Sequence, residues 1–251
     1  DLVRSRGLGD VYKRQNKKRM RYFAIILLQL LFNSTYGQRF TYPSIKAVAT
    51  GITEFIPKGW IIYDSVSGDL NKDAVKDLVL VLQHSDSVQM LNNDGDEVVT
   101  QPRILLILFK SKSGNRYNLQ QQSNTFILQH EHSNMDDPFV GITIEKGLLM
   151  IQFHLFYNSG SWYTTNSTYK FRHNNNAFVL IGAELSTIHR ATLDFEDHSF
   201  NFLTKKHSCT KGNEGNNTKK TTVTTMAHTR AATLSTFAQP FTLQIDNAVY
   251  L

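Results

Sequence analysis

The stretch Asp69-Leu-Asn71-Lys-Asp73-Ala-Val75-Lys-Asp77 runs directly into the apolar segment Leu78-Val-Leu-Val-Leu82. Four short oxygen-bearing side chains stand at positions 1, 3, 5 and 9 of this stretch, and the apolar segment has the composition of a buried β-strand. Calcium takes about six to eight oxygen ligands, which a short loop supplies when alternate side chains point inward. The spacing predicts a structural calcium site on a β scaffold. Its predicted ligands are the side chains of Asp69, Asn71, Asp73 and Asp77, and the carbonyl of Val75.

Two alternatives bear on this calcium prediction. An EF-hand is excluded, because Leu80 stands where that loop needs a bidentate glutamate and Ala74 stands where it needs glycine. The metal-free alternative is an Asp/Asn-rich turn that caps its own backbone amides. A second acidic segment, Asn92–Glu97, contains Asn-Asp-Gly and lacks a fourth spaced ligand, so we expect only a hairpin loop there.

The first 19 residues are expected to lie outside the folded domain. Residues 1–15 resemble translated sequencing-adapter sequence, and we treat residues 1–19 as a leader that is either non-native or untranslated. The following segment, residues 20–37, has the pattern of a secretory signal peptide. A basic residue follows Met20, an apolar run follows that, and small residues lead to a cleavage site after Gly37.

The apolar run of this segment extends from Tyr22 to Phe32, which is short of the ~20 residues that a membrane-spanning helix needs. A buried core helix is the alternative for the run. Cleavage would leave a mature chain of residues 38–251 in the periplasm or outside the cell, with no stable membrane insertion.

The positive charge of the chain is concentrated in the leader and the signal segment. The chain has 27 Lys/Arg against 21 Asp/Glu, and residues 1–37 hold eight of the former and two of the latter. Residues 38–251 are therefore balanced at 19 of each. This balance gives no indication of a nucleic-acid partner. The one cysteine, Cys209, cannot form an internal disulfide, and we interpret it as a surface thiol.

The mature chain is predicted to be mainly β, an antiparallel sheet assembly in one domain with one short N-terminal helix at Ser44–Phe55. Continuous apolar runs predict central strands at Leu78–Leu82 and Arg103–Phe109. Hairpin turns are predicted at Lys146-Gly147, at His173–Asn176 and at Asp197-His198. Residues 205–232 are rich in Lys, Thr, Asn and Gly and predict a mobile polar excursion, after which a closing strand is expected from Leu234.

Several motifs of the second half extend the similarity beyond the Asp69 loop. They are Asp136-Asp-Pro-Phe139-Val-Gly141-Ile-Thr-Ile144, Gly147-Leu-Leu-Met-Ile151, Gly160-Ser-Trp162, Thr168-Tyr-Lys-Phe171-Arg and Phe178-Val-Leu-Ile-Gly182. With these motifs the chain resembles bacterial secreted proteins of largely unknown function that carry a single FG-GAP/VCBS-like calcium loop. Lys72 and Ala74 stand where that family usually has glycine. The resemblance implies an antiparallel β domain and a secreted location, and it implies no enzyme.

Two further groups of residues are candidates for chemistry. His130-Glu131-His132, with Asp136 and Asp137 nearby, has donors that zinc accepts, although the same segment has the composition of an ordinary solvated loop. The aromatic residues around Gly160-Ser-Trp162-Tyr163 are candidates for a glycan- or peptide-binding platform, or for core packing. They include Phe156, Tyr157 and Tyr169.

No catalytic residue is predicted, because the sequence lacks a nucleophile elbow, a phosphate loop and spaced cysteine pairs. The leading hypothesis is a secreted or periplasmic binding module with a protein or glycan ligand and a structural calcium loop. The alternatives are a hydrolase of envelope polymers that uses the His130 group, and a periplasmic inhibitor of a lytic enzyme that inserts the loop 158–165.

Overall fold

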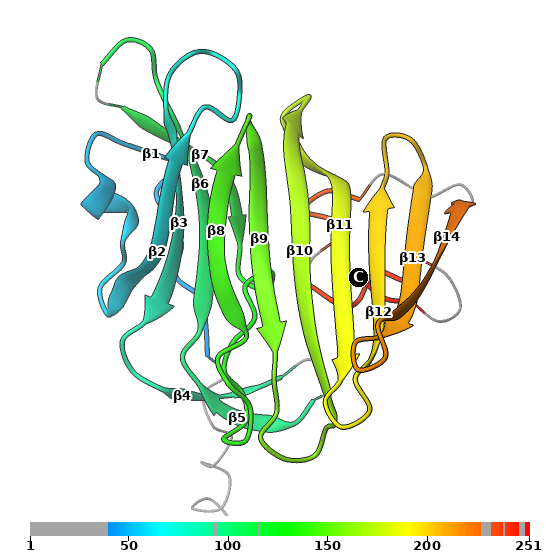
Figure 1. Cartoon of the computed structure of the whole chain (residues 1–251). Coiled ribbons are helices and arrows are strands. Elements are labelled where there is room, and N and C mark those ends of the chain that lie inside the picture. Colours follow the sequence, from blue (N-terminus) through cyan, green and yellow to red (C-terminus); the bar gives the residue numbers. More distant parts are fainter. Residues whose placement is uncertain (1–39, 93–94, 115, 227–231, 238, 246–248) are drawn as a thin grey trace, which may run out of the picture. The chain divides into compact units, whose positions relative to one another are not determined.

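The structure is a computed structural model that describes residues 40–251 apart from 93–94, 115, 227–231, 238 and 246–248 (Figure 1). The leader and the signal peptide expected in residues 1–37 lie outside the described residues. In the part of the chain that the structure describes, no helix is long and apolar enough to cross a membrane.

The described residues are mainly β structure in antiparallel sheets, which confirms the predicted fold class. One sheet has the strand order β1-β7-β6-β3-β2, a second has the order β14-β13-β12-β11-β10-β9-β8, and β4 and β5 form a separate pair. The bounds are β1 Val48–Ala49, β2 Trp60–Gly68, β3 Asp77–His84, β4 Val88–Leu91, β5 Glu97–Thr100, β6 Arg103–Lys110, β7 Tyr117–Ser123, β8 Phe139–Glu145, β9 Leu148–Leu155, β10 Tyr163–Asn174, β11 Ala177–His189, β12 Asp194–Asn201, β13 Lys206–Asn213 and β14 Thr218–Thr225.

The central strands β3 and β6 of the first sheet are buried on both faces, which explains their continuous apolar runs. Val79 and Val81 of β3 face the main core between the sheets. Their neighbours Leu80 and Leu82 face a second core, where Phe55 and Trp60 cover the outer side. A strand with apolar contacts on both faces needs no polar alternation. Strands β4 and β5 pair as antiparallel neighbours on either side of the hairpin loop expected within Asn92–Glu97, of which residues 93–94 lie outside the described residues.

The second sheet is a meander in which the turns between β8 and β9 and between β10 and β11 were predicted correctly. Lys146 and Gly147 join β8 to β9 with φ of 51° and 75°, and Asn175 and Asn176 join β10 to β11 with φ of 47° and 61°. Positive φ at both central residues matches the right-handed twist of a hairpin. Alternate residues of β9 and β10, such as Ile151 and Tyr169, lie in the main core.

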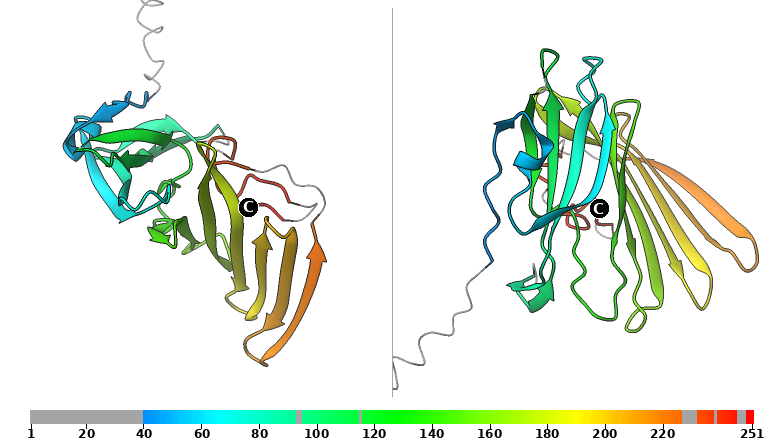
Figure 2. Two further views of the ribbon diagram at one scale, coloured as in Figure 1. Left: turned by 90° about the horizontal axis from the view of Figure 1, so that it is seen from above. Right: turned by 90° about the vertical axis from the view of Figure 1, so that its left-hand side faces the viewer.

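The two sheets meet along β2 and β8, which lie side by side without forming a backbone ladder (Figure 1). Asp64, at a bulge of β2, accepts a 3.0 Å hydrogen bond through Oδ2 from the amide of Ile142 in β8. Gly68 packs so closely on Ile144 that a Cβ added to this glycine would lie 2.6 Å from Cγ2 of Ile144. The strands β12 to β14, yellow to orange, continue the second sheet past the first one (Figure 2).

Four segments differ from the sequence-based expectation. Within 44–55, expected to be a short helix, the structure has strand β1 and one 3-10 turn, Ile52–Phe55. Pairing of Val48 with Asn118 of β7 holds that segment extended. The turn expected at Asp197-His198 is the middle of the continuous strand β12. After residue 232 the described residues form isolated bridges, of Thr233 with Val179 and of Gln244 with Tyr250, instead of a closing strand, and they bury Leu234 and Phe237 in the main core.

The fourth difference concerns 205–232, expected to be a mobile polar excursion. Residues 206–225 form β13 and β14, which pair along their whole length. Threonine has a high β propensity, and an edge strand that faces solvent needs no apolar side chains. All eight residues of β14 are exposed. The low apolar content of this segment therefore reflects a solvent-facing strand and not a mobile excursion.

Candidate functional site

The Asp69–Asp77 loop closes on itself through its own side-chain oxygens. The Asp69 carboxylate accepts hydrogen bonds from the amides of Asp73 at 3.1 Å and Ala74 at 2.9 Å. Asn71 Oδ1 accepts from Asp73 at 3.1 Å, and Asp73 Oδ1 accepts from the amide of Val75 at 2.8 Å. These bonds curl the backbone around the side-chain oxygens at positions 1, 3 and 5.

Two residues of this loop have the left-handed backbone conformation that glycine adopts most readily. Lys72 has a φ of 62° and Ala74 a φ of 67°. For residues with a Cβ this conformation costs about 1–2 kcal/mol each. Lys72 and Ala74 are the two positions where the resembled family usually has glycine. The backbone therefore has a glycine-type conformation at both positions, although neither residue is glycine.

Asp77 is placed differently from the other predicted ligands. Its side chain is fully buried, with Oδ2 accepting from the amide of Leu70 at 3.0 Å and Oδ1 from the amide of Lys110 at 3.1 Å. Burial raises the pKa of Asp77, although both amide hydrogen bonds act in the opposite direction. Since each oxygen already binds an amide, Asp77 ties the loop to β6.

The three carboxylates of the loop do not converge as the structure stands. Among the described residues, only one group of three or more His, Cys, Asp or Glu side chains has donor atoms that all lie within 4.8 Å of one another, and it lies elsewhere. The oxygen donors of Asp69, Asn71 and Asp73 have the chemistry that calcium prefers. Asp77 already accepts two amide hydrogen bonds, which favours a contact with calcium through water over direct coordination.

The second candidate group, around His130, lines a polar pocket of about 250 Å³ together with Arg103 and Asp137. His130 Nε2 makes a 2.6 Å hydrogen bond with the carbonyl of Met135. Asp137 binds the buried Arg103 at two points, 2.8 and 2.5 Å, and accepts a 2.7 Å hydrogen bond from the Tyr63 hydroxyl. Asp136 does not line this pocket. The remaining lining residues of the pocket are Tyr63, Gln83, Ser87, Val99, Thr100 and Gln101.

The electrostatics of this pocket favour a structural role for Asp137. Burial alone would raise the pKa of Asp137, but the hydrogen bonds from Arg103 and Tyr63 outweigh it and lower the pKa. Burial and then the hydrogen bond to Asp137 raise the pKa of Tyr63. An ionised carboxylate held by a guanidinium is a poor general acid. The pocket therefore lacks the pair of carboxylic groups that polymer hydrolysis uses.

The aromatic candidates divide into core and surface residues. Tyr169 is fully buried, whereas Trp162 and Tyr163 are 65% and 55% exposed. The Trp162 ring stacks on His189 with centroids 6.2 Å apart, and the Tyr163 ring meets His189 edge-on at 4.9 Å. The exposed Trp162 and Tyr163 and the half-buried His189, here named the aromatic platform, lie together at the start of β10 and the end of β11.

Arg190 fixes the loop that carries this platform. Its guanidinium donates hydrogen bonds to the carbonyls of Tyr157, at 2.9 Å, and Ser161, and it lies 4.7 Å from the centroid of the Phe156 ring. The Arg190 amide also donates to the carbonyl of Trp162 at 2.8 Å. A large exposed ring on an anchored loop loses little conformational entropy on binding a ligand.

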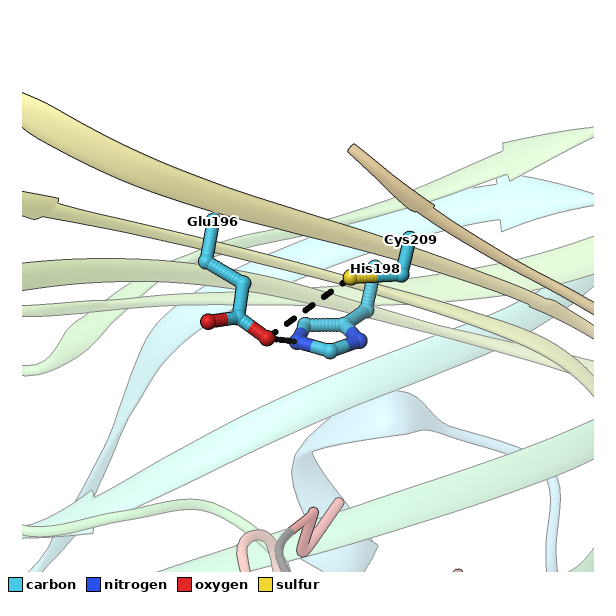
Figure 3. Close-up of side chains that lie close together, drawn as sticks. All are labelled: Glu196, His198 and Cys209. Atoms are coloured by element: carbon cyan, nitrogen blue, oxygen red, sulfur yellow. Dashed lines mark hydrogen bonds and ion pairs between the residues drawn. The ribbon is translucent and has the colours of Figure 1, made fainter. Parts of the chain in front are cut away.

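A third group was not foreseen from the sequence (Figure 3). Glu196 and His198 of β12 and Cys209 of β13 bring one ligand atom each to within 4.8 Å of one another. Glu196 Oε1 lies 2.9 Å from His198 Nε2 and 3.7 Å from Cys209 Sγ. Its other carboxylate oxygen pairs with Lys211 Nζ at 2.8 Å.

The thiol of this group lacks the environment of a catalytic nucleophile. Burial and then the charge of Glu196 raise the pKa of Cys209. The thiol donates its hydrogen bond to the carboxylate, so His198 does not act as its base. A catalytic cysteine needs the opposite environment, with a nearby positive charge or a positioned base.

Sequence reasoning missed this group because Asp197-His198 was expected to be a turn. In a continuous strand, residues 196 and 198 share a face, and the register pairs His198 directly with Cys209. The one available signal was Glu-x-His followed by a cysteine in the next strand.

Comparisons of the chain with protein-family models, curated proteins and solved structures find no match. The resemblance to secreted proteins with an FG-GAP/VCBS-like loop therefore stays a prediction. The assignment of function rests on the sites themselves.

Proposed function

We propose that this chain is a secreted or periplasmic binding module that recognises a glycan through the aromatic platform. The observation that carries the proposal is the 65% exposure of Trp162 on a loop that Arg190 anchors. Burying a Trp side chain contributes strongly to binding, and tryptophan is among the residues most often found at binding hot spots. An exposed, fixed tryptophan is therefore the strongest feature for ligand binding on the described surface.

The surroundings of the platform favour a sugar over an apolar peptide. The Thr192 hydroxyl contacts His189 Nδ1 at 3.1 Å and donates to Asp194 at 2.7 Å. Hydrogen bonds from Asn213 and then Thr192 lower the pKa of Asp194. A sugar ring offers a C–H face for stacking and hydroxyl groups around its rim, so it complements flat aromatic rings bordered by hydroxyl and carboxylate groups.

Calcium has a structural role in this proposal. The Asp69–Asp77 loop joins β2 to β3, and a calcium ion bound by Asp69, Asn71, Asp73 and the Val75 carbonyl would fix that connection. The left-handed backbone at Lys72 and Ala74 and the all-oxygen donor set support the site. Asp77 would act through water and keep its hydrogen bonds to Leu70 and Lys110.

The two alternative functions make different use of the same features. A hydrolase would need a second acid in the His130 pocket, where Asp137 is held by Arg103. An inhibitor of a lytic enzyme would insert the loop 158–165, which carries Trp162, and so remains the second candidate. It predicts inhibition of a lysozyme-type enzyme by the chain, with no affinity for free sugar.

The experiment is calorimetric titration of the full chain with a panel of oligosaccharides, including N-acetylated envelope fragments. We expect binding that Trp162→Ala abolishes and that the matched variant Tyr250→Ala retains, because Tyr250 is also exposed, at 47%, but lies outside the platform. Equal affinity of wild type and Trp162→Ala would refute the platform. Failure to bind any sugar, together with inhibition of lysozyme, would support the inhibitor function.

A further inference from the structure

The group Glu196, His198 and Cys209 lies outside both sites used above, and its donor atoms differ from those of the calcium loop. It offers one carboxylate oxygen, one imidazole nitrogen and one sulfur. Calcium binds oxygen ligands, whereas zinc accepts all three of these donor types. We propose that these three residues bind one zinc ion and leave its fourth coordination position to water.

Two of the distances between the donor atoms are close to those around a tetrahedral ion. Bonds of about 2.3 Å to sulfur and about 2.0–2.1 Å to nitrogen and oxygen place neighbouring ligands roughly 3.3–3.6 Å apart. Glu196 Oε1 lies 2.9 Å from His198 Nε2 and 3.7 Å from Cys209 Sγ. Both distances differ from the tetrahedral values by a few tenths of an ångström, all three donor atoms lie within 4.8 Å of one another, and the three side chains turn toward one another (Figure 3).

The β scaffold holds these donors rigidly. His198 and Cys209 are directly paired in the ladder between β12 and β13, and Glu196 is two residues from His198 on the same face. Ladder hydrogen bonds on both sides of β12 hold the backbone of two ligands in place. A site built on regular strands is more precise than one built on a loop.

A second layer of contacts orients the ligands. His198 Nδ1 makes a 2.8 Å hydrogen bond with His207 Nε2, which directs Nε2 of His198 toward Glu196 and Cys209. Phe200, which pairs with His207 across β12 and β13, stacks on the His207 ring with centroids 4.3 Å apart and so fixes its orientation. Lys211 holds the outer oxygen of Glu196. Metal-binding histidines usually have such a partner on the second ring nitrogen.

The exposure of the ligands leaves one side of the ion open. The His198 side chain is 7% exposed and the Glu196 side chain 39% exposed, so the group is buried on one side and reaches solvent on the other. Three protein ligands with an open position distinguish this arrangement from closed four-ligand structural sites. The open position would accept water or an anionic ligand.

Titration of the reduced, chelator-treated full chain with cobalt(II), followed by displacement with zinc, tests this proposal. Cobalt(II) reports its ligands through a sulfur-to-cobalt charge-transfer band in the near ultraviolet and through visible bands typical of tetrahedral coordination. We expect one equivalent to bind, with both features present, and zinc to remove them. Absence of the charge-transfer band in the wild type would overturn the site.

Variants separate the ligands from their surroundings. Cys209→Ser should lose the charge-transfer band, and His198→Gln should lose the visible bands of tetrahedral cobalt. His207→Gln should keep both features and bind about 10-fold to 100-fold more weakly. The control, His130→Gln, should bind like the wild type. Unchanged cobalt spectra in Cys209→Ser, or loss of binding in His130→Gln, would place the metal elsewhere. Circular dichroism of each variant distinguishes ligand loss from unfolding.

Discussion

Arg103 and Asp137 are joined by two parallel hydrogen bonds, Nη1 to Oδ1 at 2.8 Å and Nη2 to Oδ2 at 2.5 Å. The Arg103 side chain is 3% exposed, and its guanidinium also donates to Gln83 Oε1 and to the carbonyl of Leu128. This pair joins β6 of the first sheet to the segment that leads into β8 of the second. It therefore connects the two sheets at a polar point beside the main core.

Asp137→Asn should destabilise the fold by about 2–4 kcal/mol, because it leaves the buried Arg103 charge without its carboxylate. Asp136→Asn is the matched control and should be nearly neutral, since Asp136 is exposed. Urea unfolding at pH 7 measures both. Equal stabilities of the two variants would show that the pair contributes nothing.

The same pair predicts a pH dependence. The pKa of Asp137 is lower in the folded chain than its ordinary value, so the stabilisation is fully present above the unfolded-state pKa of about 3.9. It is lost as the pH falls through the folded-state pKa. The stability difference between wild type and Asp137→Asn should therefore shrink on acidification below about pH 4. A difference that grows on acidification would contradict this assignment.

Ala74→Gly should stabilise the chain by about 1 kcal/mol. At Ala74 the left-handed conformation, with a φ of 67°, costs alanine free energy that glycine does not pay. The greater flexibility of glycine in the unfolded chain offsets part of this gain, and about 1 kcal/mol remains. Ala177→Gly, in strand β11 with ordinary φ, should instead lose about 0.5–1 kcal/mol. Thermal unfolding compares the two variants, and destabilisation by Ala74→Gly would mean that the loop backbone differs from the one described.

Calcium should raise the melting temperature of the wild type at about 2 mM, above the ~0.1–1 mM dissociation constants of extracellular sites. At about 2 to 20 times its dissociation constant, such a site contributes about 0.6–1.8 kcal/mol. The double variant Asp69→Ala, Asp73→Ala should lose this response, whereas Asp96→Ala in the β4–β5 loop should keep it. A response retained by the double variant would assign the calcium effect to other residues.

Gly68→Ala should destabilise the contact between the two sheets by about 1–3 kcal/mol, because the new Cβ would lie 2.6 Å from Ile144 Cγ2. Adding Ile144→Ala should recover part of that loss relative to the sum of the single changes. A double-mutant cycle in urea measures the coupling. Strictly additive effects would show that β2 and β8 do not pack as described.

The fold class follows from local sequence patterns, and the particular sites do not. Lys146-Gly147 and Asn175-Asn176 specify their hairpins locally, since both turns need residues that tolerate positive φ. The long apolar runs of β3 and β6 correctly indicated central strands. By contrast, every residue of strand β14 is exposed, so its sequence lacks the alternation of apolar and polar residues that would identify a strand.

The candidate sites depended on register, which sequence reasoning did not supply. His198 meets Cys209 only because β12 continues through residue 197, and its pairing with β13 sets that register. Asp77 was correctly associated with the Asp69 loop, but its amide partner Lys110 is 33 residues away in β6. The local spacing predicted which side chains bring oxygen atoms to the loop. It could not distinguish a side chain that would bind calcium from one, such as Asp77, that ties the loop to a neighbouring strand through backbone amides.

Trp162 emission in the presence of glycan tests the central claim most directly. The chain has two tryptophans, and the other, Trp60, is 7% exposed, so acrylamide quenching reports mainly Trp162. We predict that a bound oligosaccharide shifts the emission to shorter wavelength and protects it from acrylamide, with no such change in Trp162→Phe. Binding of the oligosaccharide with Trp162 still fully open to acrylamide would contradict recognition through the aromatic platform.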